Sequence, residues 1–197
     1  MYYSISSPVS SQFKDRGSRF LAFAHHVRSA EAAKELIDGY RNKFHDARHV
    51  CFAYVLNEPS RTERSNDDGE PSGTAGKPIL NQIIKRQLSD ILVVVVRYFG
   101  GVLLGTPGLI NAYRTATELA LQEAEIISYE PFATFRISYP YTSMQAVINK
   151  VQQVGGKLER MEYGDQTISA EVSIPQSSES VFAQWLNGQY EICQSVS

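Results

Sequence analysis

The chain has 197 residues, of which 43% are hydrophobic, and a formal net charge of −2 at pH 7. This length fits one medium domain and one small domain, and the apolar fraction is high enough to build a core. The near-neutral charge excludes a protein that coats nucleic acid or acidic membranes through charge alone. Because no basic segment with a following apolar run opens the chain, and the longest aliphatic stretch (91–96) is too short to cross a bilayer, we expect a cytoplasmic protein with no membrane partner.

Residues 1–130 alternate between strand and helix patterns. Residues 13–24 predict two strands joined by a turn at Gly17, and Ser29 is a predicted helix cap. The run 50–56 is apolar on both faces and predicts a strand in the interior of its sheet. The remaining predictions in this half are, in chain order, a long polar loop over 57–77, a helix from Pro78, a strand over 91–96 and a helix over about 107–125.

Glu130-Pro131 predicts a domain boundary, because proline cannot prolong the preceding helix. Beyond it the pattern restarts with an alternating strand, a helix ended by Gly155-Gly156, a hairpin around Gly164-Asp165, another helix and a short strand over 190–193. This order, βαββαβ, predicts a ferredoxin-like sandwich. The sequence therefore predicts an α+β protein with two domains, residues 1–130 and 131–197.

The segment over 67–77 is unusually rich in carboxylates and small residues. Its carboxylates are Asp67, Asp68 and Glu70. A phosphate-binding P-loop would need glycine in place of Pro71 and Ser or Thr in place of Pro78, and the carboxylates lack the spacing of an EF-hand calcium loop. Two interpretations remain, a solvated acidic turn and a cluster that holds Mg²⁺ or Ca²⁺. The backbone N–H groups of 73–77, which lead into a helix, could also bind an anion.

The segment after the strand over 91–96 combines a cation, two rings and two glycines. These residues are Arg97, Tyr98, Phe99, Gly100 and Gly101. The guanidinium is a fixed positive charge and the rings could stack on bases, whereas the glycines allow a backbone or a ligand to approach closely. We expect one of the two rings to face the core. The whole stretch from Arg97 to Gly108, which continues through a second glycine-rich turn into a helix, predicts either tight backbone packing or a binding surface.

Patterns typical of zinc sites and nucleophilic enzymes are missing from the sequence. His45 and His49 have i, i+4 spacing, but the end of a helix between them would break that geometry, and no cysteine provides a partner ligand. There is no G-x-S-x-G elbow and no Cys–His signature. Cys51 and Cys193 are interpreted as buried free thiols. We therefore expect no catalytic residue, no metal site and no cofactor.

Four segments, in the same order along the chain, resemble the hallmark motifs of the Impact/YigZ family. They are Gly17-Ser18-Arg19-Phe20-Leu21-Ala22, Ala47-Arg48-His49-Val50-Cys51, the acidic segment from Asp67 to Gly76, and Arg97-Tyr98-Phe99-Gly100-Gly101. The match spans about residues 13–121. The chain departs from the family pattern at Pro107, where another glycine is usual, and this removes one N–H from any anion-binding loop.

The resemblance implies a first domain similar to domain IV of elongation factor G, a two-layer β/α fold shared with a small-subunit ribosomal protein. It also implies a second, ferredoxin-like domain similar to the last domain of that factor. Family members are linked to translational control, and the eukaryotic Impact protein restrains a starvation-activated kinase by competing for the kinase's activator. Because this chain begins directly at the motif-bearing domain, we expect a bacterial-type member without that kinase role.

These observations favour a non-catalytic binding protein that contacts RNA, the ribosome or a translation-related protein. RNA binding would need a local basic patch, with the candidates Arg16, Arg19, Arg48, Lys77, Lys85, Arg86 and Arg97. The predicted ligand- or nucleic-acid-binding residues are Arg19, His49, Asp67, Asp68, Glu70, Gly73, Thr74, Lys77, Arg97, Tyr98, Gly100 and Gly101. Two alternatives stay open: a metal-dependent enzyme that uses the acidic segment on a phosphorylated or peptide-like small molecule, and a protein–protein adaptor that uses the second domain.

Overall fold

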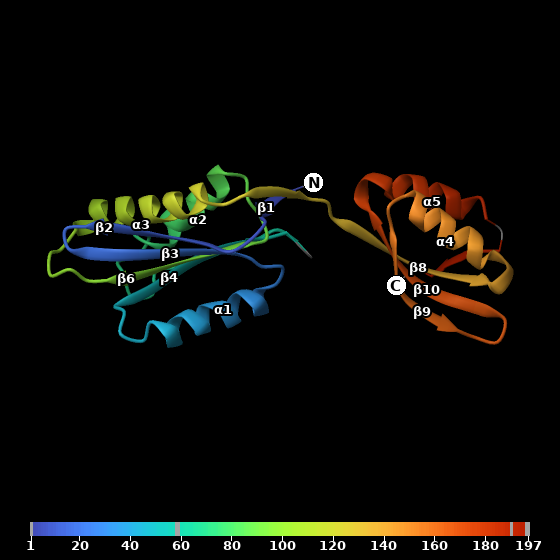
Figure 1. Cartoon of the computed structure of the whole chain (residues 1–197), viewed down its shortest axis with the longest axis horizontal. Coiled ribbons are helices and arrows are strands. Elements are labelled where there is room, and N and C mark those ends of the chain that lie inside the picture. The colour runs from blue at the N-terminus through green and yellow to red at the C-terminus, as the bar shows by residue number, and fades with distance from the viewer. Residues whose placement is uncertain (1, 58–59, 190, 196–197) are drawn as a thin grey trace. The chain divides into compact units, whose positions relative to one another are not determined.

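The computed structural model describes residues 2–57, 60–189 and 191–195. They form two compact units, one spanning residues 2–129 and one beginning at Glu130, each with its own sheet and helices (Figure 1). The α+β class predicted from the sequence is confirmed. Within the described ranges, no helix combines the length and the apolar character that crossing a bilayer requires.

The first unit is organised around a five-stranded antiparallel sheet. In spatial order its strands are β2 (Val9–Asp15), β3 (Ser18–His26), β6 (Ile91–Tyr98), β4 (His49–Leu56) and β5 (Thr62–Asn66). The predicted hairpin at Gly17 is present as β2 and β3, and the strand predicted over 50–56 has a neighbour on each side. A separate antiparallel pair joins β1 (Tyr2–Ile5) to β7 (Ile126–Tyr129).

Helices cover both faces of this sheet, so the first unit has three layers where the sequence predicted two. Helix α1 (Ala30–Lys43), capped by the Ser29 side chain, lies on one face, and α2 (Gly76–Lys85) and α3 (Gly105–Gln122) lie on the other (Figure 1). The reason is visible in β6, whose side chains are buried on both faces. Val93 and Val95 belong to the core beneath α2 and α3, whereas Val94 belongs to the core beneath α1. A strand that is apolar on both faces needs a helix layer on each side.

Three strands, β1, β5 and β7, were not predicted from the sequence. β5 lies inside the expected polar loop, and every one of its residues, Thr62 to Asn66, is exposed. As an edge strand it is held by backbone hydrogen bonds to β4, which leave no hydrophobic pattern in the sequence. β7 follows α3, which ends at Gln122 rather than near Glu125. Residues 58 and 59 of the expected loop lie outside the described residues.

The second unit has the predicted βαββαβ order. Its elements are β8 (Phe132–Pro140), α4 (Met144–Gln153), β9 (Lys157–Tyr163), β10 (Thr167–Pro175), α5 (Glu179–Asn187) and β11 (Cys193–Ser195), with short 3₁₀ turns at Tyr141–Ser143 and Gln176–Ser178. The antiparallel sheet has the order β11-β8-β10-β9, and alternate residues of β8 and β10 form one core with α4 and α5. The last strand lies slightly later than predicted, and Tyr190 lies outside the described residues. The likeness of both domains to those of elongation factor G stays a prediction.

Candidate ligand-binding site in the first domain

Three neighbouring strands place Phe20, Arg97 and His49 side by side. In the sheet register, Arg97 of β6 lies opposite Phe20 of β3 and opposite His49 of β4. Because side chains alternate along a strand, Arg97 shares the face of Val93 and Val95, which is the face covered by α2 and α3. The Arg97 guanidinium carbon lies 5.6 Å from the centroid of the Phe20 ring. The family-like motifs thus meet at the carboxyl end of β6.

Arg97 forms a buried ion pair with Glu70 of the acidic segment. The Nη1 atom of Arg97 is 2.6 Å from Glu70 Oε1, and the two side chains are only 6% and 3% exposed. The Tyr113 hydroxyl of α3 donates a second hydrogen bond of 2.8 Å to the same oxygen. Arg97 and Glu70 were both predicted site residues, but their pairing was not foreseen. Tyr113 belongs to the family-like pattern of the sequence, but it was not among the predicted site residues.

The His49 side chain is hydrogen-bonded to the backbone of Asp68. His49 Nδ1 donates to the Asp68 carbonyl oxygen at 2.7 Å, which leaves Nε2 facing Glu70 at 3.9 Å. The Asp68 carboxylate accepts from the backbone N–H of Val50 at 2.7 Å and from Arg41 Nη2 at 3.1 Å. Asp68 therefore anchors the acidic segment to the start of β4 and to α1.

Asp67 occupies the anion-binding loop that the sequence predicted for residues 73–77. Its carboxylate accepts hydrogen bonds from the backbone N–H groups of Gly73, Ala75 and Gly76, at 2.9, 2.9 and 2.8 Å. Burial raises the pKa of Asp67, but these three donors outweigh it and hold the pKa below its usual value. The anion at the start of α2 thus comes from the chain itself, and these amides are not open to an external ligand.

Thr74 and Lys77 differ in their exposure to solvent. Thr74 is buried, and both its N–H and its hydroxyl donate to the Pro71 carbonyl oxygen, so it closes a turn rather than facing a ligand. Lys77 is exposed on the first turn of α2. Of the predicted residues in this segment, only Lys77 retains a side chain that a ligand could reach freely.

The two glycines after β6 have different structural roles. A Cβ on Gly100 would lie 1.8 Å from the carbonyl carbon of Gly17, so this glycine allows the loop to pack on the β2–β3 turn. Gly101 has a φ of +86°, in the left-handed region that favours glycine. Tyr98 is half-buried toward α1, with its hydroxyl donating to Asp46 at 2.8 Å, whereas Phe99 is 49% exposed. The outward-facing ring is therefore Phe99.

A pocket of about 470 Å³ opens beside the Arg97–Glu70 pair. It is lined by the two pairing residues together with Arg48, His49 and Pro71. The rest of its lining comes from the loop before α3 and from the first turns of that helix, namely Phe99, Leu103, Leu104, Gly105, Thr106 and Leu109. Its apolar wall is contributed mainly by Phe99, Leu103, Leu104 and Leu109. Leu103 is 81% exposed at the rim. The sequence did not mark Leu103 or Thr106 as site residues, because a leucine and a threonine in a glycine-rich loop have no distinctive pattern.

The same end of the first domain carries several cations, and we call it the basic end. It consists of the β2–β3 turn with Arg16, the start of β3 with Arg19, residues 46–49 with Arg48, and the loop over 99–104. Arg19 lies over the Tyr98 ring, 4.5 Å from its centroid, and the Arg48 backbone N–H donates to the Arg97 carbonyl oxygen. Arg16, Arg19 and Arg48 are exposed, and none forms an ion pair with any residue that the structure describes.

The other cations suggested by the sequence do not join this surface. Lys85 and Arg86 lie at the far end of α2, where Arg86 donates to the Leu121 carbonyl oxygen at 2.8 Å. Arg97 is buried in its ion pair and forms part of the pocket wall rather than of the exposed surface. The basic patch is therefore smaller than the seven residues predicted.

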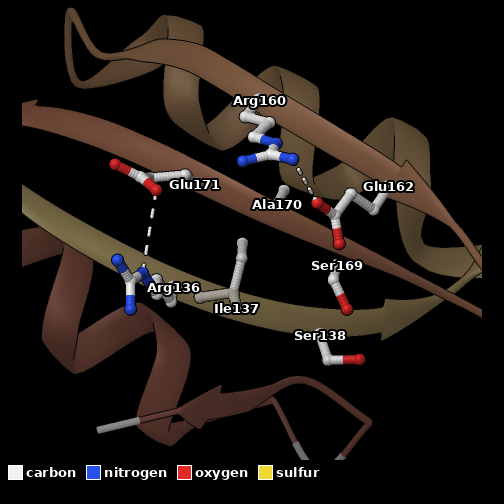
Figure 2. Close-up of a pocket in the computed structure, with 8 residues that line it drawn as sticks. All are labelled: Arg136, Ile137, Ser138, Arg160, Glu162, Ser169, Ala170 and Glu171. Atoms are coloured by element: carbon white, nitrogen blue, oxygen red, sulfur yellow. Dashed lines mark ion pairs between the residues drawn. The ribbon is translucent and has the colours of Figure 1, made fainter. Parts of the chain in front are cut away.

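A second pocket, of about 340 Å³, lies on the open face of the sheet in the second domain. Figure 2 shows that arginines and glutamates of β8, β9 and β10 face one another across it. Arg160 pairs with Glu162 at 2.9 Å and Arg136 with Glu171 at 3.7 Å. Because the charges balance, this face does not favour phosphate over any other ligand.

A metal site would need free carboxylate oxygens, and most of those in the acidic segment already accept hydrogen bonds from the protein. Asp67 binds backbone amides, Asp68 binds Val50 and Arg41, and Glu70 binds Arg97 and Tyr113 through Oε1. Among the residues with described positions, no group of three or more His, Cys, Asp or Glu is arranged to hold a metal ion.

Comparison with known proteins identifies the family. The family model of the Impact N-terminal domain matches residues 16–121. IMPACT family member YvyE of Bacillus subtilis is 30% identical over 97% of this chain and 89% of that protein, and YigZ of Escherichia coli is 35% identical over 80% and 78%. A crystal structure of a hypothetical protein with 30% identity superposes with a TM-score of 0.79 and covers 100% of this chain and 97% of that one. The chain therefore belongs to the Impact family.

Proposed function

We propose that this Impact-family protein is a non-catalytic binding protein that contacts RNA of the translation machinery through its basic end. The observation that carries the proposal is that three exposed arginines lie at this end of the domain: Arg48 lines a pocket with the exposed ring of Phe99, Arg19 lies over the Tyr98 ring, and Arg16 stands on the β2–β3 turn. Arginine pairs with phosphate in a planar, bidentate geometry, and an exposed aromatic ring stacks on bases. A formal net charge of −2 is compatible with this function because the cations are concentrated locally.

The translational context rests on the family. The motifs set out above resemble those of proteins linked to translational control, and family membership supports the same context for this chain. Ribosomal RNA is the most abundant RNA in that setting, so a ribosome is the natural first probe.

The metal-dependent enzyme is the weaker alternative. Its ligands would be Asp67, Asp68 and Glu70, but all three carboxylates accept hydrogen bonds from the protein. Glu70 also balances the charge of buried Arg97, and moving it onto a metal would leave that guanidinium without its partner. These contacts support a structural role for the acidic segment.

The test is co-sedimentation with RNA and with ribosomes over a series of salt concentrations. If three arginines each replace a counterion on single-stranded RNA, the slope of log K against log salt is about −2, and Arg16→Ala should reduce its magnitude by about 0.7. Arg64→Ala is the matched control, since Arg64 is an exposed arginine of β5 away from this end. Arg97→Ala is unsuitable because it would leave Glu70 buried and unpaired.

Binding that does not change with salt, or that Arg16→Ala and Arg64→Ala weaken equally, would contradict the proposal.

One observation favours a second candidate, a protein partner: Val102 and Leu103 are 52% and 81% exposed, next to Phe99. Apolar side chains grouped at a loop tip are typical of protein contacts. Pull-down that survives nuclease treatment and is lost in Leu103→Ser would favour this candidate over RNA.

A further inference from the structure

The pocket at the basic end contains a buried hydrogen-bond donor with no acceptor. Arg97 is 6% exposed, and its Nη1 binds Glu70, but its Nε–H has no partner among the residues that the structure describes. A buried guanidinium N–H without an acceptor is costly and rare. Arg97 lines the pocket, so this unpartnered donor belongs to a side chain that a bound ligand would contact.

The start of α3 provides further donors to the same pocket. Gly105 and Thr106 line it, and within the described part of the chain their backbone N–H groups have no acceptor. This helix has 18 residues, no side-chain cap and no acidic residue in its first turn. The contrast with α2 is direct, because there Asp67 fills the equivalent position. The start of α2 is bound by a carboxylate of the chain itself, whereas the start of α3 borders an open pocket.

The charge around the pocket also favours an anion. The Glu70 carboxylate is balanced by Arg97, whereas Arg48 lines the pocket, is exposed and lacks an ion-pair partner in the described residues. The partial positive charge at the start of α3 adds to that of Arg48. His49 Nδ1 donates to the Asp68 carbonyl oxygen, so its Nε2 is directed at Glu70, 3.9 Å away.

The remaining wall suits a flat, partly apolar group. The Phe99 ring is 49% exposed, and Leu103, Leu104 and Leu109 extend the wall toward α3. The volume, about 470 Å³, lies within the roughly 300–1,000 Å³ typical of small-molecule pockets. We propose that this pocket binds one nucleotide, with its phosphate at Arg48, the Arg97 Nε–H and the start of α3, and its base against Phe99.

The nucleotide could be a free mononucleotide or the 5′-phosphorylated end of an RNA. If the ligand is an RNA end, the inference deepens the proposed function and rests on it. If the ligand is a free mononucleotide, the inference is independent of the proposed function. Arg16 lies on the β2–β3 turn and does not line the pocket. Its substitution therefore tests RNA binding without changing the nucleotide site.

The test is calorimetric titration of the full chain with 5′-AMP, adenosine and inorganic phosphate, together with NMR of the backbone amides. We expect 5′-AMP to bind at least about tenfold more tightly than adenosine, and Arg48→Ala to weaken it by about tenfold, because a charged hydrogen bond to phosphate is lost. Leu103→Asp should weaken it too, since it places a carboxylate at the exposed rim. Arg64→Ala is the matched control and should have no effect. The amide signals of Gly105 and Thr106 should shift.

Equal affinity for 5′-AMP and adenosine, no binding of 5′-AMP at millimolar concentration, or an unchanged affinity in Arg48→Ala would overturn the inference. A short RNA with a 5′-phosphate that binds more tightly than its 5′-hydroxyl form identifies the RNA end as the source. Binding of 5′-AMP without that preference identifies a free mononucleotide. If 5′-AMP fails to bind but co-sedimentation still depends on Arg16, only this inference falls and the proposed function stands.

Discussion

Removing the buried carboxylate of Glu70 should destabilise the first domain strongly. In Glu70→Ala, Arg97 Nη1 loses an acceptor at 2.6 Å, and the Tyr113 hydroxyl loses one at 2.8 Å. The Arg97 side chain is 6% exposed and its Nε–H already lacks a partner among the described residues, so the guanidinium would be left buried without a counter-charge. Breaking a buried ion pair in this way costs about 3–5 kcal/mol. Glu70→Gln keeps the shape and one acceptor, and we expect a smaller cost of about 1.5–3 kcal/mol.

Urea denaturation of the full chain followed by circular dichroism measures this loss. Trp185, the only tryptophan, lies in α5, so its fluorescence reports the second domain and provides an internal control. The transition of the first domain should move to lower urea, while the tryptophan transition stays in place. The double variant Glu70→Leu with Arg97→Met should be more stable than Glu70→Ala, because no charge is left unpaired. A loss below about 1 kcal/mol in Glu70→Ala would refute the reasoning, since surface pairs reach only that value.

Three further predictions concern a glycine, a carboxylate and a thiol. Gly100→Ala should destabilise the first domain in thermal unfolding, because its Cβ would lie 1.8 Å from the backbone of the β2–β3 turn. Gly39→Ala, on an open part of α1, should instead stabilise the domain by about 0.5–1 kcal/mol. Equal effects of the two substitutions would contradict this prediction. Asp67→Asn should cost about 1–2 kcal/mol at pH 7. The pKa of Asp67 is lowered in the folded state. The stabilisation from its carboxylate is therefore complete above the usual pKa of about 3.9 and is lost as the pH falls through the lowered value. The denaturation midpoints of the wild-type protein and of Asp67→Asn should converge in acid. Burial raises the pKa of the Cys51 thiol. In a Cys193→Ser background, a thiol reagent at pH 8 should therefore react with Cys51 only after the protein unfolds. Rapid labelling of the native protein would contradict this and show that the region around Cys51 opens.

Much of the fold could be predicted from side-chain patterns. The spacing after Ser29, the apolar run 91–96 and the alternation after Pro131 each specify an element, because burial on one or both faces leaves a period in the sequence. β5 was missed for the same reason, because an exposed edge strand is held by backbone bonds that are independent of side chains. The third layer was missed although the run 50–56 is apolar on both faces, because the sequence does not say which helix covers which face.

Residue types and their order were enough to identify the family, the α+β class and the two segments that form the candidate site. The contacts that these residues make depend on how the chain folds. The sheet register sets Arg97 beside His49, and the fold brings Glu70 to Arg97 and Asp67 to the start of α2. In the sequence, a carboxylate that accepts hydrogen bonds from the chain's own amides looks the same as one that binds a ligand. Their difference lies in which donors the folded chain places within hydrogen-bonding distance, and that is fixed by packing between elements far apart in the chain.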